Sequence, residues 1–151
     1  MNNKIKWDRK LVPVNEEIIH DVENKLGIKF PDDYIHCVIE NHGARPIPKV
    51  YDIGDKKGKV FGFLLSYDKN DDYYFIDEYN ALKEILSIGV IPFADDPIGN
   101  NICFDYREDK DNPVVVYWDH EIAANNPEKA IIYICDNFTD LLEKLYNPDL
   151  T

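Results

Sequence analysis

The spacing of apolar residues predicts an amphipathic helix that begins after Asn15 and ends at Gly27. Asn15 is a suitable N-cap, and the two glutamates after it favour the positive end of the helix dipole. Four apolar residues then recur on one helical face: Ile18, Ile19, Val22 and Leu26. Gly27 can adopt the left-handed backbone conformation that commonly ends a helix.

A second amphipathic helix is predicted after Phe30. Pro31 suits a first turn because its missing N–H costs nothing there, and two aspartates follow it. The apolar stripe of this helix consists of Tyr34, Ile35, Val38 and Ile39. The run NHG at 41–43 ends it.

Beyond residue 43 the pattern changes to short apolar runs rich in β-branched and aromatic residues, which predict strands. These runs are residues 50–53, 59–65, 90–93, 101–106, 114–118 and 130–135. Helical spacing returns at 77–86 and again after Asn137, a suitable N-cap for a closing helix. The order predicts one α+β domain over residues 1–151, with its core at about 15–147, in which helices cover a mainly antiparallel sheet.

The charge balance narrows the class of partner. Lysine and arginine number 17 and aspartate and glutamate 29, which gives a net charge of −12. A phosphate backbone would be repelled by such a surface, so we expect no direct nucleic-acid partner. The apolar runs are far shorter than a membrane span, so we expect no membrane partner. An acidic surface suits a basic protein partner.

The start of the chain and its cysteines favour a cytoplasmic location. The first ten residues are polar and basic and lack the apolar run of a signal peptide. Three cysteines, Cys37, Cys103 and Cys135, lie among apolar residues and form no C-x-x-C pair. This pattern is typical of a reducing compartment, where thiols pack as small hydrophobic groups.

The motifs of common enzymes are missing from the sequence. There is no glycine-rich phosphate loop, no H-E-x-x-H pair and no G-x-S-x-G turn, and the four histidines are scattered. We therefore expect no catalytic residue, no metal and no cofactor. His120, between two acids, is the best single candidate for a base, although a polar turn explains it more simply. A hydrolase that uses Asp95, Asp96 and His120 remains an alternative, while an Asx-type turn accounts for the surrounding residues.

The remaining acids gather in loops bordered by tyrosines. Tyrosine supplies contact area and acids attract basic partners at long range, so such loops suit protein binding. We expect the following residues to contact a partner: Asp71, Asp72, Tyr73, Asp95, Asp96, Glu108, Asp109 and Glu121. A solvated loop is the simpler interpretation of any one charge run.

Four segments of the chain resemble, in order, the SUKH superfamily, which includes the yeast Smi/Knr cell-wall regulators. They are LGIKFPDDY at 26–34 with NHG at 41–43, then IPFAD at 91–95 with GN at 99–100 and ICFD at 102–105, then VYWDHE at 116–121, and finally the helix that starts with DNF at 136–138. The chain departs from the usual pattern at three positions. Phe30 replaces a leucine, His42 replaces a glycine and Asn100 stands where aspartate is common.

The resemblance implies a SUKH-like fold and a non-catalytic binding protein. Bacterial members are commonly immunity proteins that neutralise polymorphic secreted toxins, often nucleases, in the cytoplasm. The resemblance therefore favours an immunity protein that blocks the basic active cleft of a cognate toxin, an RNase or a DNase. A regulatory scaffold that binds other cellular proteins, like the yeast relatives, is the alternative. A neighbouring gene for a secreted toxin would distinguish the two.

Overall fold

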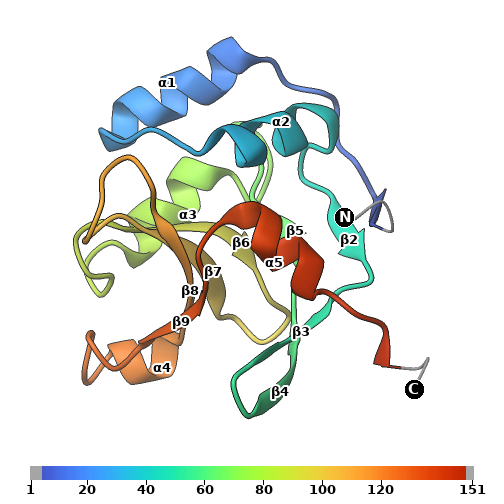
Figure 1. Ribbon diagram of the computed structural model, residues 1–151. Helices are drawn as coiled ribbons and strands as arrows, with labels where there is room; N and C mark the ends of the chain where they lie inside the picture. Colours follow the sequence, from blue (N-terminus) through green and yellow to red (C-terminus); the bar gives the residue numbers. More distant parts are fainter. Residues whose placement is uncertain (1–4, 149–151) are drawn as a thin grey trace.

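A five-stranded antiparallel sheet lies at the centre of the computed structural model, which describes residues 5–148 (Figure 1). Its strands are neighbours in chain order, each joined to the next as an antiparallel pair. They are β5 (Phe63–Leu64), β6 (Val90–Asp95), β7 (Asn101–Asp105), β8 (Val114–Trp118) and β9 (Ile131–Cys135). The predicted meander of neighbouring strands is confirmed.

Two antiparallel ribbons accompany this sheet among the described residues. One joins β1 (Lys6–Asp8) to β2 (Arg45–Ile47), with Trp7 opposite Pro46. The other joins β3 (Val50–Ile53) to β4 (Lys56–Val60). The first ribbon brings the start of the chain beside the segment that follows the second helix.

Five helices occur in residues 5–148, and the caps predicted for the first and the last of them are confirmed. They are α1 (Glu16–Leu26), α2 (Asp32–Glu40), α3 (Phe75–Leu82), α4 (His120–Ala123) and α5 (Phe138–Lys144). The Asn15 side chain accepts a hydrogen bond from Ile18 N–H at 3.0 Å, and Gly27 has a φ of 72°. Asn137 caps α5 in the same way, through Asp140 N–H at 2.8 Å.

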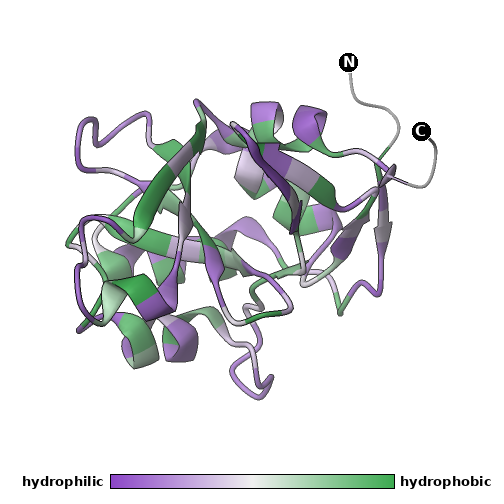
Figure 2. Ribbon diagram, turned by 90° about the horizontal axis from the view of Figure 1, so that it is seen from below, coloured by the Kyte–Doolittle hydropathy of each residue, from purple (hydrophilic) through white to green (hydrophobic). Residues whose placement is uncertain are grey.

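The main core lies between one face of the sheet and the helices α1, α2 and α5. Tyr34 of α2 is fully buried at its centre, where it contacts the rings of Phe93, Phe104 and Phe138. A smaller core on the other face includes Trp118 and is covered by α4 and the chain after α3. In Figure 2 hydrophobic residues gather on the central strands and hydrophilic residues on the outer loops.

Two predicted elements differ from the structure. The strand expected at 59–65 is two strands, because Gly62 leaves the β4 ladder and donates its N–H to the Asp95 carbonyl oxygen at 2.7 Å. The helix expected at 77–86 spans Phe75–Leu82 instead. After Leu82 the chain continues as a turn, in which the Leu82 carbonyl oxygen accepts the N–H groups of Ile85 and Leu86, and Leu86 is buried in the smaller core.

Candidate partner-binding surface

The loop at 66–74 holds three of the predicted partner-binding residues. Its base is closed by two backbone hydrogen bonds, from Ser66 N–H to Tyr73 O at 2.9 Å and from Phe75 N–H to Ser66 O at 2.7 Å. The Asp71 carboxylate accepts the Tyr73 N–H at 2.8 Å, which fixes the tip. Asp72 is exposed and the Tyr73 side chain is 46% exposed. This closed loop therefore presents an acid and a tyrosine to solvent.

A cavity of about 270 Å³ opens beside this loop, and we call it the arginine cavity. Asp71 and Tyr73 line one side of it. The opposite side comes from the start of the chain and from β2, and it includes Arg9, Leu11 and Arg45. The Tyr73 ring packs edge-on against Phe63 at 4.6 Å between centroids.

Asp95 lies close to this loop, because Phe63 contacts both Asp95 and Tyr73 of the loop. The Phe63 N–H donates to the Asp95 carboxylate at 3.2 Å, and Phe63 and Asp95 are paired between β5 and β6. Asp95 is partly buried, and this burial raises the pKa of its carboxyl group to about 7. A positive group from a partner would stabilise its charged form.

Asp96 was expected to contact a partner, but it is buried in the structure. Its side chain is 5% exposed and accepts the N–H groups of Ile98 at 3.0 Å and Asn100 at 2.9 Å. These bonds form the Asx-type turn that joins β6 to β7. Asp96 therefore holds this turn and offers little surface to a partner.

Asn100, Tyr117 and His120 form a polar network behind this turn. The Asn100 amide oxygen lies 2.6 Å from His120 Nδ1, and its amide nitrogen donates to the Tyr117 hydroxyl at 2.6 Å. The Tyr117 hydroxyl in turn donates to Asp96 at 3.3 Å. An amide, not a carboxylate, is thus the partner of His120, so Asp96 and His120 do not form the acid–base pair that the hydrolase alternative requires.

The other three predicted residues are exposed and lie outside the 66–74 loop, and Glu121 follows His120, whose N–H donates to Asn100 of the β6–β7 turn at 3.0 Å. Glu108 and Asp109 are in the loop between β7 and β8, whereas Glu121 is in the first turn of α4. The N–H of Asp111 and the Asn112 side chain bond to Asp109 and lower its pKa. In the β6–β7 pairing, Asp95 stands opposite Asn101 and Val90 opposite Asp105, so Glu108 and Asp109 follow the far end of this hairpin. The eight residues therefore do not form one contiguous surface.

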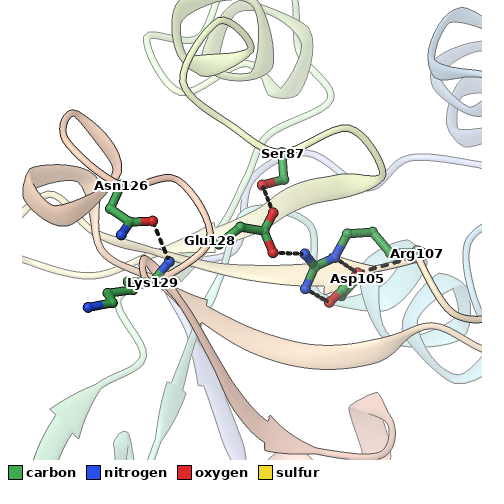
Figure 3. Close-up of polar contacts among 6 residues, drawn as sticks. All are labelled: Ser87, Asp105, Arg107, Asn126, Glu128 and Lys129. Carbon is green, nitrogen blue, oxygen red and sulfur yellow. Dashed lines mark hydrogen bonds and ion pairs between the residues drawn. The ribbon is translucent and has the colours of Figure 1, made fainter.

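An ion-pair network holds the loops near Glu108 and α4 against the sheet (Figure 3). The Arg107 guanidinium donates to both oxygens of the buried Asp105, at 3.0 and 2.9 Å. It also donates to Glu128 at 3.1 Å, and Ser87 donates to the other Glu128 oxygen at 3.4 Å. The chain after α4 is thus tied to the end of β7.

Residues 5–148 were searched for a metal site, a reactive thiol and a membrane-spanning helix. This part of the chain contains no group of three or more His, Cys, Asp or Glu side chains suited to a metal ion. Burial raises the pKa of Cys37 and of Cys135 to about 12, so neither thiol is a ready nucleophile. No described helix has the length and apolar character needed to cross a membrane.

The residues of the arginine cavity that come from the start of the chain were not predicted. Arg9 and Leu11 meet Phe63 and Tyr73 only because β1 pairs with β2, and β2 packs near β5. This arrangement depends on contacts between distant segments, which local sequence patterns do not report. The pair Leu11-Val12, apolar within a polar stretch, was the one local signal.

The chain matches the SMI1 / KNR4 family (SUKH-1) over residues 13–144 and belongs to that family. The resemblance to the SUKH superfamily is thereby confirmed at the level of the family. A search of curated proteins gives no match.

Proposed function

We propose that this protein is an immunity protein of the bacterial cytoplasm that binds a cognate secreted toxin, a nuclease, and covers its basic active cleft. Membership of the SUKH-1 family is the observation that carries the proposal. The proposed mode of action is non-catalytic, because covering a cleft needs affinity and bulk but no chemistry.

The charge of the protein supports a basic toxin as the partner. A nuclease must present cationic groups to phosphate, and a protein with a net charge of −12 attracts such a surface over a long range. Attraction of this kind raises the rate of encounter, which matters for an inhibitor that must act before the toxin cleaves nucleic acid.

We place the main contacts at the 66–74 loop. Asp72 and Tyr73 are exposed there and Asp71 is partly exposed, and the loop is fixed by its own hydrogen bonds. Asp95, joined to the loop through Phe63, adds a carboxyl group whose charged form a lysine or arginine of the toxin would stabilise. Glu108, Asp109 and Glu121 lie on other parts of the surface and contribute mainly to long-range attraction.

Co-expression tests this proposal. The product of the neighbouring toxin gene is expressed in a sensitive host with and without this protein, and growth is measured. The proposal expects growth to be restored by the wild-type protein and reduced by Asp72→Lys or Tyr73→Ala. Glu84→Lys, which changes the same charge at an exposed residue outside the loop, is the matched control and should still restore growth.

Failure of the wild-type protein to restore growth would contradict the immunity proposal. In that case binding to other cellular proteins, the scaffold role, becomes the better interpretation. Rescue that is reduced equally by Asp72→Lys and by Glu84→Lys would leave the immunity role standing and contradict the placement of the contacts at the loop.

A further inference from the structure

We propose that the arginine cavity binds the carboxylate of a small organic acid with an apolar or aromatic body, or the same chemistry at the carboxyl terminus of a peptide. The site lies between the β1–β2 ribbon and the 66–74 loop. This inference does not depend on the proposed toxin, although Asp71 and Tyr73 belong both to the cavity and to the 66–74 loop.

The positive charges that line the cavity are unpaired. Within the described part of the chain, neither Arg9 nor Arg45 forms an ion pair or a hydrogen bond through its guanidinium group. Asp8 stands opposite Arg45 in the β1–β2 register, yet no ion pair joins them. Arg107, by contrast, is bonded to two carboxylates. Arg9 is exposed and Arg45 is partly exposed, so both guanidinium groups are available to an anion that enters this cavity, where an acidic chain places two positive charges together.

The backbone of Arg9 adds a second, independent indication. Its φ of 59° is the only positive value at a non-glycine residue in the described range. This conformation costs roughly 1–2 kcal/mol for a residue with a side chain, and such strain persists mainly where the surrounding structure enforces it, often at ligand sites. Arg9 occupies this conformation where it lines the cavity.

The walls of the cavity are apolar and already in place. The Leu11 N–H donates to His42 O at 2.8 Å, and the Leu64 N–H donates to Ala44 O at 2.9 Å. The Leu11 side chain lies directly over Gly43, where a Cβ atom would come within 2.5 Å of it. Phe63 and Tyr73 form an edge-on aromatic pair on the other side. A preformed apolar wall favours a ligand with an apolar body, because little ordering is needed on binding.

The volume of the cavity and the net charge of its lining further restrict the class of ligand. A volume of about 270 Å³ lies at the small end of ligand cavities and suits a single ring or branched chain. The lining carries two guanidinium groups and one carboxylate, Asp71, so one positive charge is left over. This balance matches a monocarboxylate better than a doubly charged phosphate.

Titration followed by NMR and calorimetry tests the proposal on the whole protein. The probes are 3-phenylpropionate, its neutral alcohol 3-phenylpropanol, inorganic phosphate, and a tripeptide ending in phenylalanine with a free or an amidated terminus. We expect 3-phenylpropionate or the free-terminus peptide to bind at least about tenfold more tightly than the alcohol, the amidated peptide or phosphate, a difference of about 1.4 kcal/mol. The amide signals of Leu64 and Tyr73 should shift. Binding of the free acid alone or of the peptide alone would identify the source of the carboxylate.

Variants locate the site. Arg9→Gln/Arg45→Gln should weaken the preferred probe by at least about tenfold. Lys56→Gln/Lys129→Gln, which removes two charges from exposed positions elsewhere, should leave the affinity unchanged. If the double arginine variant does not fold, the shifts of the Leu64 and Tyr73 amide signals in the wild-type protein still locate the site. No binding of any probe, equal binding of acid and alcohol, or equal binding of phosphate would overturn the proposal.

Discussion

At the scale of single residues, His42 joins three parts of the chain from a buried position. It is 2% exposed, its Nδ1 lies 2.7 Å from Val12 O, and its Nε2 accepts the N–H of Tyr67 at 2.8 Å. Because a backbone N–H can only donate, Nε2 is the acceptor and Nδ1 carries the proton that bonds to Val12. His42 therefore fixes the chain segment that forms one wall of the arginine cavity.

Replacing His42 should cost much more than replacing an exposed histidine. His42→Ala leaves the buried Tyr67 N–H without its partner and removes the bond to the carbonyl of the exposed Val12, and we expect the free energy of unfolding to fall by about 1–3 kcal/mol. His36→Ala, at an exposed position of α2, should change it by less than about 0.5 kcal/mol. Urea unfolding of both variants measures the difference. Equal effects would show that the two hydrogen bonds contribute little.

Asp95 should make the stability depend on pH. Burial raises the pKa of its carboxyl group from 3.8 to about 7 in the folded protein, so the folded state holds this proton more tightly than the unfolded chain. The contribution of Asp95 to stability is therefore present below about pH 4 and is lost as the pH rises to about 7. Asp95→Asn cannot titrate and can still accept the Phe63 N–H.

The comparison of wild type with Asp95→Asn isolates this effect. We expect the two proteins to be similarly stable near pH 4 and the variant to be more stable above pH 7, by about 1–2 kcal/mol after allowing for partial exposure. Thermal unfolding across this range provides the measurement. A stability difference that does not change with pH would mean that the folded pKa of Asp95 is ordinary.

At the scale of elements, the Arg107 network holds the chain after α4 against the sheet. Arg107→Ala leaves the buried Asp105 carboxylate without its charged partner, and we expect a loss of about 1–3 kcal/mol in the free energy of unfolding. Hydrogen exchange should rise most in residues 119–130, because their tie to β7 through Glu128 is broken. Lys110→Ala, an exposed neighbour, should leave both quantities unchanged. A uniform rise in exchange would contradict this role.

The elements that could be predicted from sequence are those whose signals are local. Caps such as Asn15 and Asn137, and the left-handed Gly27, act within one turn and appear as expected. The β1–β2 ribbon was not predicted, because Trp7 pairs with Pro46, far away in the sequence, and the strands are only three residues long. The break at Gly62 was missed for the same reason, since its cause is a bond to Asp95.

At the scale of the whole molecule, composition predicts the charge of a partner but does not predict which acids lie exposed on the surface. The excess of acids follows from counting, whereas the burial of Asp96 depends on how the β6–β7 turn folds. Asp71, Tyr73 and Asp95 were selected separately for charge or loop position, and the structure links them through Phe63. Glu108 and Asp109 were also selected for charge and loop position, but they lie beyond the end of the β6–β7 hairpin that is far from Asp95.

The central claim is that this acidic protein acts by binding a basic partner. Calorimetry between the purified protein and an inactive form of the proposed cognate toxin tests this most directly, at low and at high salt. We expect a complex whose dissociation constant rises at least about tenfold from low to high salt, because exposed charges are screened. No complex at low salt, or an affinity that salt leaves unchanged, would contradict the claim.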